Sequence, residues 1–182
     1  MNKVQAAVFV LVLVGAGVLF SWGLPFAAAK GPESQLLAAP YTAELVSGTV
    51  TFPAQWELDL VATSAGSARA SRSDVTVIAT DAIWFGSSQR LLANINDLLL
   101  DGAASLPSVP DDAKGLELET YVLEASMDEV PVSINVSRHD VSVVLVLVKG
   151  SQQNREKVAT DLEAIVDSID ITAPSIDVEA RQ

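Results

Sequence analysis

The chain begins with a long hydrophobic stretch. No charged residue occurs between Val4 and Ala29, and the run from Ala6 to Phe20 is apolar throughout. About 20 helical residues span the roughly 30 Å of hydrocarbon in a bilayer, and Gln5 to Leu24 supplies that length. The pattern therefore predicts that residues 1–29 form a single-pass transmembrane anchor.

The charges on either side of this stretch predict its orientation. Lys3 and the terminal amine precede it, whereas all 23 acidic residues of the chain follow Lys30. The positive-inside rule then places the N-terminus in the cytoplasm. We expect a protein of the cell membrane whose remaining residues are extracytoplasmic.

A cleaved signal peptide is the alternative interpretation. Ala27-Ala28-Ala29 fits an A-x-A cleavage site before Lys30. The apolar stretch is longer than the roughly 7–15 residues of a signal-peptide core, and Pro25 lies close to the cut, which favours a retained anchor. Export is expected in either case.

Small residues mark one part of the predicted anchor. They are Gly15, Gly17 and Ser21, and the last two are four residues apart, on the same helical face. Such spacing lets two membrane helices approach closely, although glycine is also common in membrane helices in general. We take these residues as a candidate surface for packing against another membrane helix.

The exported part opens with a predicted linker and a strand. Residues 30–40 contain Gly and Pro without strong periodicity, which is typical of a linker. Thr49–Phe52 is predicted to be a strand, ended by Pro53, which has no N–H to donate to a ladder. Trp56 follows this turn and is expected to cover the core.

Two more strands and a helix follow. Ser67–Arg72 and Val75–Thr80 alternate or are β-branched, and Ser73-Asp74 joins them as a turn. The period then changes, because Gln89–Leu100 places its leucine and isoleucine side chains on one helical face. Ser87 or Ser88 is the expected N-cap of this helix and Gly102 its C-cap, and the proline-rich residues 103–114 are expected to form a loop.

Three strands are predicted beyond this loop. Leu116, Leu118, Thr120 and Val122 alternate with Glu117 and Glu119, so we expect the first set to face the core and the glutamates to face solvent. Val130–Val136 alternates in the same way. Val141–Val148 is apolar almost throughout, which indicates a central strand covered on both faces. The segment 137–140 is expected to be the turn between the last two strands.

The closing element is a second helix. Ser151 is the expected N-cap, and the inner stripe consists of Val158, Leu162, Ile165, Val166 and Ile169. Residues 173–182 are predicted to be an acidic, frayed tail. The order of elements predicts an α+β fold for residues 41–172, an antiparallel sheet of about six strands packed with two helices.

This order of elements resembles a known family. The run G-x-V-x-F-P-x-x-W from Gly48 to Trp56, a mid-chain helix, a three-stranded meander and a last helix ending at 165–169 are similar to the PsbP/Mog1-like family. The resemblance covers about residues 41–172. It implies an adaptor without shared catalytic residues, since family members include subunits that dock on the lumenal face of photosystem II.

Charge and cysteine content narrow the function classes. From residue 31 onward nine basic residues stand against 23 acidic ones, a net charge of −14. Such a surface repels phosphate, which argues against nucleic acid as a partner and against contact with anionic lipid headgroups. Cysteine is absent, which excludes disulfides, a thiol nucleophile and a lipid-modified cysteine, and is common in bacterial extracytoplasmic domains.

No constellation of residues predicts catalysis, a cofactor or a metal site. His139 is the only histidine and lies in the expected turn. Asp111-Asp112, and the pair Asp97 and Asp101, lack the spacing of a calcium loop, although calcium at Asp111 stays open. No G-x-S-x-G elbow or phosphate-binding loop is present. We expect no enzyme activity.

One aromatic pair is a candidate contact surface. Trp84 and Phe85 lie between a predicted strand and a predicted helix, where they would either be exposed or cap the edge of the sheet. If they are exposed, they are the best candidates for a protein interface.

The functional expectation follows from position and charge. We expect a non-enzymatic, membrane-anchored accessory subunit that docks on the extracytoplasmic side of a membrane protein complex, with a respiratory complex as one concrete example. The alternative is a tethered binding module for a small ligand or an envelope component, which would use a cleft between helix and sheet.

Overall fold

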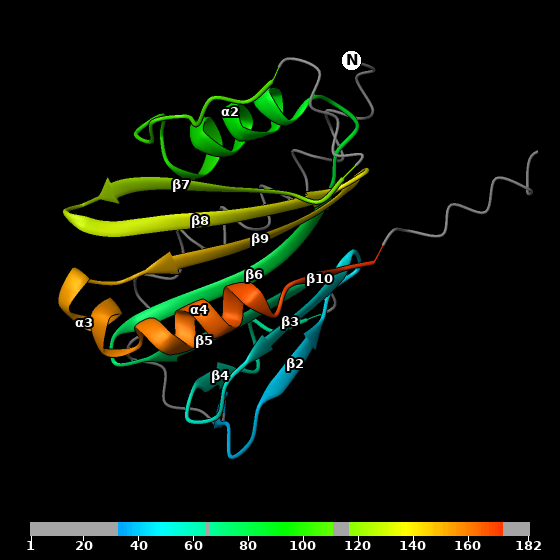
Figure 1. The fold of residues 1–182 in the computed structure, drawn as a ribbon. Coiled ribbons are helices and arrows are strands. Elements are labelled where there is room, and N and C mark those ends of the chain that lie inside the picture. Colours follow the sequence, from blue (N-terminus) through cyan, green and yellow to red (C-terminus); the bar gives the residue numbers. More distant parts are fainter. Residues whose placement is uncertain (1–32, 65, 111–116, 173–182) are drawn as a thin grey trace, which may run out of the picture.

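The computed structural model describes residues 33–64, 66–110 and 117–172 (Figure 1). The predicted anchor with Gly15, Gly17 and Ser21, the Asp111-Asp112 pair and the predicted tail lie outside the described residues. Within the described ranges, no helix is both long enough and apolar enough to cross a membrane.

The described residues form two antiparallel sheets and three helices. The larger sheet has seven strands in the order β1-β4-β5-β6-β9-β8-β7, and the smaller has three in the order β10-β3-β2. The α+β class and the antiparallel pairing predicted from the sequence are therefore confirmed. The prediction of one sheet of about six strands with two helices was wrong, because the short strands β1, β2, β4 and β10 were not predicted and the last helix is divided. The bounds are β1 (Ser34–Leu36), β2 (Tyr41–Glu44), β3 (Gly48–Phe52), β4 (Glu57–Asp59), β5 (Ser67–Arg72), β6 (Val75–Ile83), α2 (Ser88–Leu99), β7 (Glu119–Met127), β8 (Val130–His139), β9 (Ser142–Lys149), α3 (Gln152–Lys157), α4 (Ala159–Asp167) and β10 (Asp170–Ile171).

Several predicted elements occur where the sequence placed them. The strands β3, β5, β6 and β9 and the helix α2 each lie within a few residues of their predicted bounds. Ser73 and Asp74 form the turn between β5 and β6, and both have positive φ, which suits the tight turn of a twisted hairpin. The C-cap of α2 is Leu100, two residues before the predicted Gly102. Gly102 follows with positive φ, and its N–H also donates to the Asn96 carbonyl at 3.0 Å.

The domain begins earlier than the sequence predicted. Residues 34–36, predicted to belong to a linker, form β1, which pairs with β4. Leu37 is buried in the core, and its N–H donates to the Trp56 carbonyl at 2.8 Å. A three-residue strand has too little pattern to be read locally, so its pairing with β4 decides its structure.

The buried face of β7 is the opposite of the predicted one. Leu123 faces the core and pairs with Ile134 of β8, whereas Leu118 and Val122 are exposed. Glu119 lies on the inner face with Leu123. A one-residue change of phase exchanges the two faces of a strand, and both phases of this segment contain apolar residues.

The turn between β8 and β9 is shorter than predicted. β8 continues through Arg138 and His139, and only Asp140 and Val141 form the turn. The prediction of a turn at 137–140 was wrong because polar residues were assumed to leave the strand. The next strand, β9, is buried along nearly its whole length, which confirms that it is covered on both faces.

The last helix is divided in two. Ser151 caps α3 by accepting from the Asn154 N–H at 3.3 Å, as predicted. Val158 has non-helical dihedral angles and separates α3 from α4. Val158 and Ile165 are buried, whereas Leu162 and Ile169 are partly buried against the core.

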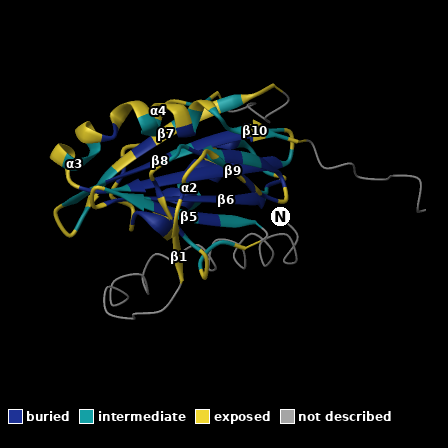
Figure 2. Ribbon diagram, turned by 90° about the horizontal axis from the view of Figure 1, so that it is seen from below, coloured by how far each residue is buried: buried dark blue, intermediate teal, exposed yellow. Residues whose placement is uncertain are grey.

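Two hydrophobic cores lie on opposite faces of the larger sheet. One lies between α2 and the sheet and includes Leu92, Ile95 and Leu145. The other lies beneath the smaller sheet and α4 and includes Trp56 and the alternating residues of β9. Figure 2 shows the outer surfaces of α3 and α4 exposed above the buried strands.

The motif that suggested the family resemblance is part of the second core. Val50, Phe52 and Trp56 are fully buried. Gly48 is required by close packing, because a Cβ there would lie 2.2 Å from the Asp170 carbonyl oxygen of β10. The indole Nε1 of Trp56 donates to Asp161 of α4 at 3.0 Å. The motif therefore joins the smaller sheet to the last helix.

Ile165→Ala should lower the free energy of unfolding by about 2–5 kcal/mol, because the side chain is fully buried between α4 and the smaller sheet. Leu162→Ala should cost less, since this side chain is only partly buried. Denaturant unfolding of the full chain in detergent, followed by tryptophan fluorescence, measures both. Leu98→Ala, at an exposed position of α2, is the control. A loss below about 1 kcal/mol for Ile165→Ala would contradict the packing.

Candidate functional site

A polar network with two buried and two partly buried members lies where α2 begins. It consists of Ser88, Glu119, Tyr121 and Arg138, called here the α2 polar cluster. Nη1 of Arg138 donates to Oγ of Ser88 at 2.7 Å, and this hydroxyl donates to Glu119 Oε2. The hydroxyl of Tyr121 donates to the same carboxylate oxygen at 3.0 Å. Three elements, α2, β7 and β8, are thus connected through polar groups.

The position of each member follows from strand register. Glu119 and Arg138 are paired directly across β7 and β8, so both side chains lie on the face that α2 covers. Nε of Arg138 also donates to the carbonyl of Asp140 at 2.9 Å, which fixes the adjoining turn. Arg138 is only 2% exposed. The guanidinium is therefore held from two sides within the packed interior.

Burial and the attraction between opposite charges act on the pKa of Arg138 in opposite directions. Burial lowers the pKa of the Arg138 guanidinium, and the nearby Glu119 carboxylate acts in the opposite direction. Burial and the hydrogen bond to Glu119 raise the pKa of the Tyr121 hydroxyl. An arginine keeps its charge near neutral pH, so the cluster is a charged but largely closed network.

The chemistry available to this cluster is limited by access. Ser88 is fully buried, and its hydroxyl already donates to Glu119 and accepts from Arg138. A serine nucleophile needs both a base and an open path to a substrate. The arrangement instead satisfies the polar groups at the start of α2, so its role is to hold this helix on the sheet.

The sequence-based interpretation missed this cluster. Arg138 was expected in a solvent-exposed turn and Glu119 on the wet face of its strand, and both expectations were wrong. One signal was available, because Arg138 continues the alternation of Val132, Ile134 and Val136 on the inner face of β8. No comparable local signal identifies Ser88 as their partner.

A buried carboxylate lies beneath the smaller sheet. Asp81 of β6 accepts a hydrogen bond from the Ser47 N–H in the turn between β2 and β3. Burial raises the pKa of Asp81, and the hydrogen bonds from the turn partly oppose this increase. The carbonyl of Ser47 in turn accepts from Thr172 at 3.1 Å, beyond β10. Asp81 therefore fastens the smaller sheet to the larger one.

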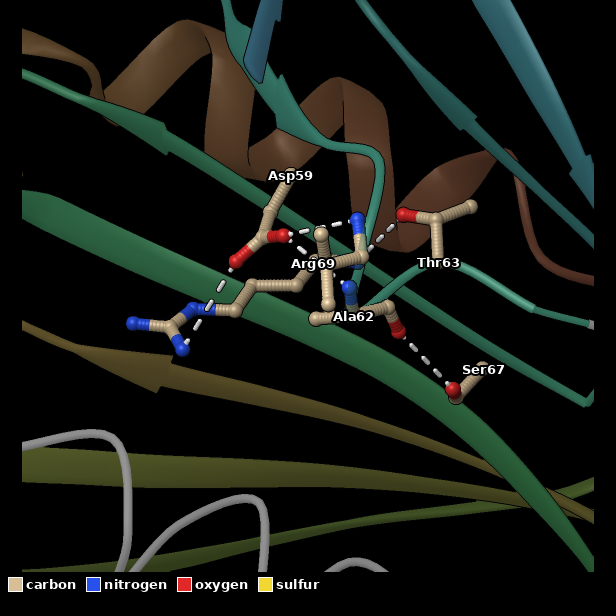
Figure 3. A network of polar contacts seen from close by, with 6 residues as sticks. Asp59, Ala62, Thr63, Ser67 and Arg69 are labelled. Carbon is tan, nitrogen blue, oxygen red and sulfur yellow. Dashed lines mark hydrogen bonds and ion pairs between the residues drawn. The ribbon is translucent and has the colours of Figure 1, made fainter. Parts of the chain in front are cut away.

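A third polar network shapes the connection between β4 and β5 (Figure 3). Oδ1 of Asp59 accepts from the N–H groups of Val61 and Ala62 at 3.1 and 2.9 Å. Nη1 of Arg69 lies 3.9 Å from the other carboxylate oxygen, and the Arg69 N–H donates to Thr63. These contacts hold the exposed side chain of Val61 in a defined turn.

The predicted aromatic contact pair is divided by the structure. Trp84 is only 4% exposed, and its Nε1 donates to the Ser87 carbonyl at 3.0 Å. Its ring also packs over Gly86, where a Cβ would lie 2.7 Å from the ring. Phe85 is 59% exposed. Trp84 thus belongs to the core, and only Phe85 is available for contact.

The other sequence candidates do not converge. His139 lies at the end of β8, opposite Ser142. Glu117, Glu124, Asp97 and Asp101 are exposed at separate places. In the part of the chain that the structure describes, no group of three or more potential metal ligands occurs.

No family model matches the sequence, and no curated protein is similar enough to count as a relative. The PsbP/Mog1-like resemblance therefore stays a prediction.

Asp81→Asn should change how stability depends on pH. Because the pKa of Asp81 is raised above 3.8 on folding, the folded protein holds this proton more tightly than the unfolded chain. The contribution of Asp81 to stability is therefore largest below the unfolded pKa and is lost as pH rises through the folded pKa. The free energy of unfolding of Asp81→Asn, relative to that of the parent, should rise between about pH 4 and pH 7. Urea titrations at several pH values measure this, with Glu44→Gln as the control for the lost charge. A constant difference would refute the prediction.

Arg138→Met should lower the free energy of unfolding by about 1–3 kcal/mol, because Ser88 and Glu119 would lose a buried partner. Adding Glu119→Gln to this variant should recover part of the loss, since the remaining carboxylate would no longer be charged. A double-mutant cycle by denaturant unfolding measures the coupling. Additive effects would show that the two side chains do not interact.

Proposed function

We propose that this protein is a non-enzymatic, membrane-anchored accessory subunit that docks on the extracytoplasmic side of a membrane protein complex. The observation that carries the proposal is that the buried polar side chains are engaged in hydrogen bonds within the fold. In the described ranges, each buried side-chain nitrogen and oxygen has a hydrogen-bond partner. Arg138 and Asp81 serve to attach covering elements to the sheet.

The interface between α2 and the sheet favours an adaptor over a small-ligand module. Leu91, Leu92 and Ile95 of α2 are buried against apolar residues of β8 and β9. A ligand site at this interface would need polar groups directed into an open space. The apolar packing here instead supports a rigid domain that acts through its outer surface.

The predicted anchor supplies the second argument. The sequence predicts a membrane span ending near Leu24, and the described domain starts at Glu33. A domain attached this closely to a bilayer meets membrane proteins at a high effective concentration. The family resemblance gives a respiratory assembly as one concrete example of such a complex.

Gly17→Leu should remove the protein from its complex without removing it from the membrane. The substitution makes the predicted anchor more hydrophobic, so insertion should persist, but leucine blocks the close helix approach that Gly17 and Ser21 permit. Solubilisation in mild detergent and affinity purification of the tagged full chain, followed by mass spectrometry, measures the retained partners.

Val12→Leu is the matched control, because it lies about 140° away around the same predicted helix. It should retain all partners of the parent. Equal retention by Gly17→Leu would show that the small residues are incidental. A parent chain that purifies alone would contradict the accessory-subunit proposal itself.

A further inference from the structure

Five of the nine exposed large apolar side chains of the described residues lie at or beside one end of the larger sheet. At this end, called here the entry end, β1, β5, β7 and β9 begin and β4, β6 and β8 end. Figure 1 shows the start of β7 and the ends of β6 and β8 together at the right of the view. Five exposed side chains lie in the connections here and are called the entry row: Val46 (71%), Leu60 (46%), Val61 (68%), Phe85 (59%) and Leu118 (64%).

Contacts between the connections place the first part of the row side by side. The Leu60 N–H donates to the Glu33 carbonyl at 2.7 Å, so this turn adjoins the start of the described chain. Val46 belongs to the turn that Asp81 holds, and its side chain lies near Gly66, 3.7 Å from the position of a Cβ there. The turns of the two sheets therefore adjoin one another.

The second part of the row follows along the same end. Ile83 pairs with Ser142, and the Trp84 N–H donates to the Val141 carbonyl at 2.8 Å, which places Phe85 beside the turn between β8 and β9. Leu118 directly precedes Glu119, whose carboxylate accepts from Ser88 at the start of α2. The entry row thus extends along the whole end of the sheet.

The length of the chain before Glu33 limits how far the β1 side of this end can lie from the predicted anchor. Only eight residues separate Leu24, the predicted end of the span, from Glu33. Fully extended, they reach about 30 Å at most, so Glu33, on the β1 side of the entry end, cannot lie farther than about 30 Å from the end of the predicted anchor.

The charge around the entry row favours a protein over a lipid surface as the group that covers it. Among the described residues, Glu33, Glu44, Glu117 and Asp140 lie exposed in the segments that carry the entry row, against one exposed cation there, Arg90. An anionic lipid surface would be repelled by these carboxylates. A protein surface with apolar side chains and basic neighbours would complement both features of the row.

We propose that the entry row is the docking surface for the extracytoplasmic face of a membrane protein, at a site that is apolar and flanked by basic residues. This inference rests on the proposed function and assigns it a surface. Phe85 and Val61 are the expected anchors, because both are held on turns whose backbone is fixed by hydrogen bonds.

The test uses two matched pairs of substitutions in the full chain. The first pair, Val61→Ser with Phe85→Ser, removes apolar area from the entry row. The control pair, Leu98→Ser with Leu106→Ser, removes exposed apolar area from the region of α2 and the loop after it. The first pair should reduce the co-purified partner at least about tenfold, at unchanged membrane abundance and melting temperature, and the control pair should not.

The outcomes separate this inference from the proposed function. If the parent holds a partner and the entry pair retains it fully, the docking surface is wrong and the accessory role stands. If the parent holds no partner, the proposed function fails. If only the control pair of substitutions reduces the co-purified partner, the entry row is not the docking surface.

A second measurement tests lipid as the occupant. Since the chain has no cysteine, Phe85→Cys accepts a single fluorophore, and the labelled full chain is placed in phosphatidylcholine nanodiscs containing nitroxide lipid. Absence of quenching relative to Leu98→Cys supports a protein partner. Strong quenching at position 85 alone would overturn it in favour of lipid contact.

Discussion

The rest of the structure depends on the burial of β9 on both faces. Val143, Leu145 and Leu147 belong to one core, and Val144, Val146 and Val148 belong to the other. A strand without a polar face is stable only if the sheet is covered on both sides. One cover is α2, whereas the other combines α4 with the smaller sheet. The fold therefore needs segments from both halves of the chain to complete each core.

Polar groups determine how these covers are attached. Arg138 connects the start of α2 to the sheet, Asp81 holds the turn of the smaller sheet, and Asp161 joins α4 to Trp56 and Arg72. A buried polar group without a partner is costly, so each of these contacts favours one arrangement of the cover over alternatives. Each cover is therefore attached to the sheet at a defined place.

The two ends of the sheet differ in what they expose. The connections of the entry end present Val61, Phe85 and other apolar side chains, in segments that also carry exposed carboxylates. Apolar side chains in such connections contribute nothing to either core. Exposed apolar side chains beside carboxylates are the feature that supports our proposal of a docking surface at this end.

The sequence alone determined the elements whose hydrophobic period is strong and local. Continuous apolarity identified β9 as a central strand, and the hydrophobic period of α2 identified the buried face of that helix. Ser73-Asp74 identified the turn between β5 and β6. These signals depend only on neighbouring residues. Tertiary structure decided the remainder. The phase of β7 was set by pairing with β8, since both of its faces carry apolar residues. The short strands β1 and β10 exist only because partners lie beside them, and Arg138 is buried only because Ser88 and Glu119 satisfy it. The entry row is likewise a tertiary property, because its members come from connections far apart in the chain that meet only when an antiparallel sheet brings their ends together.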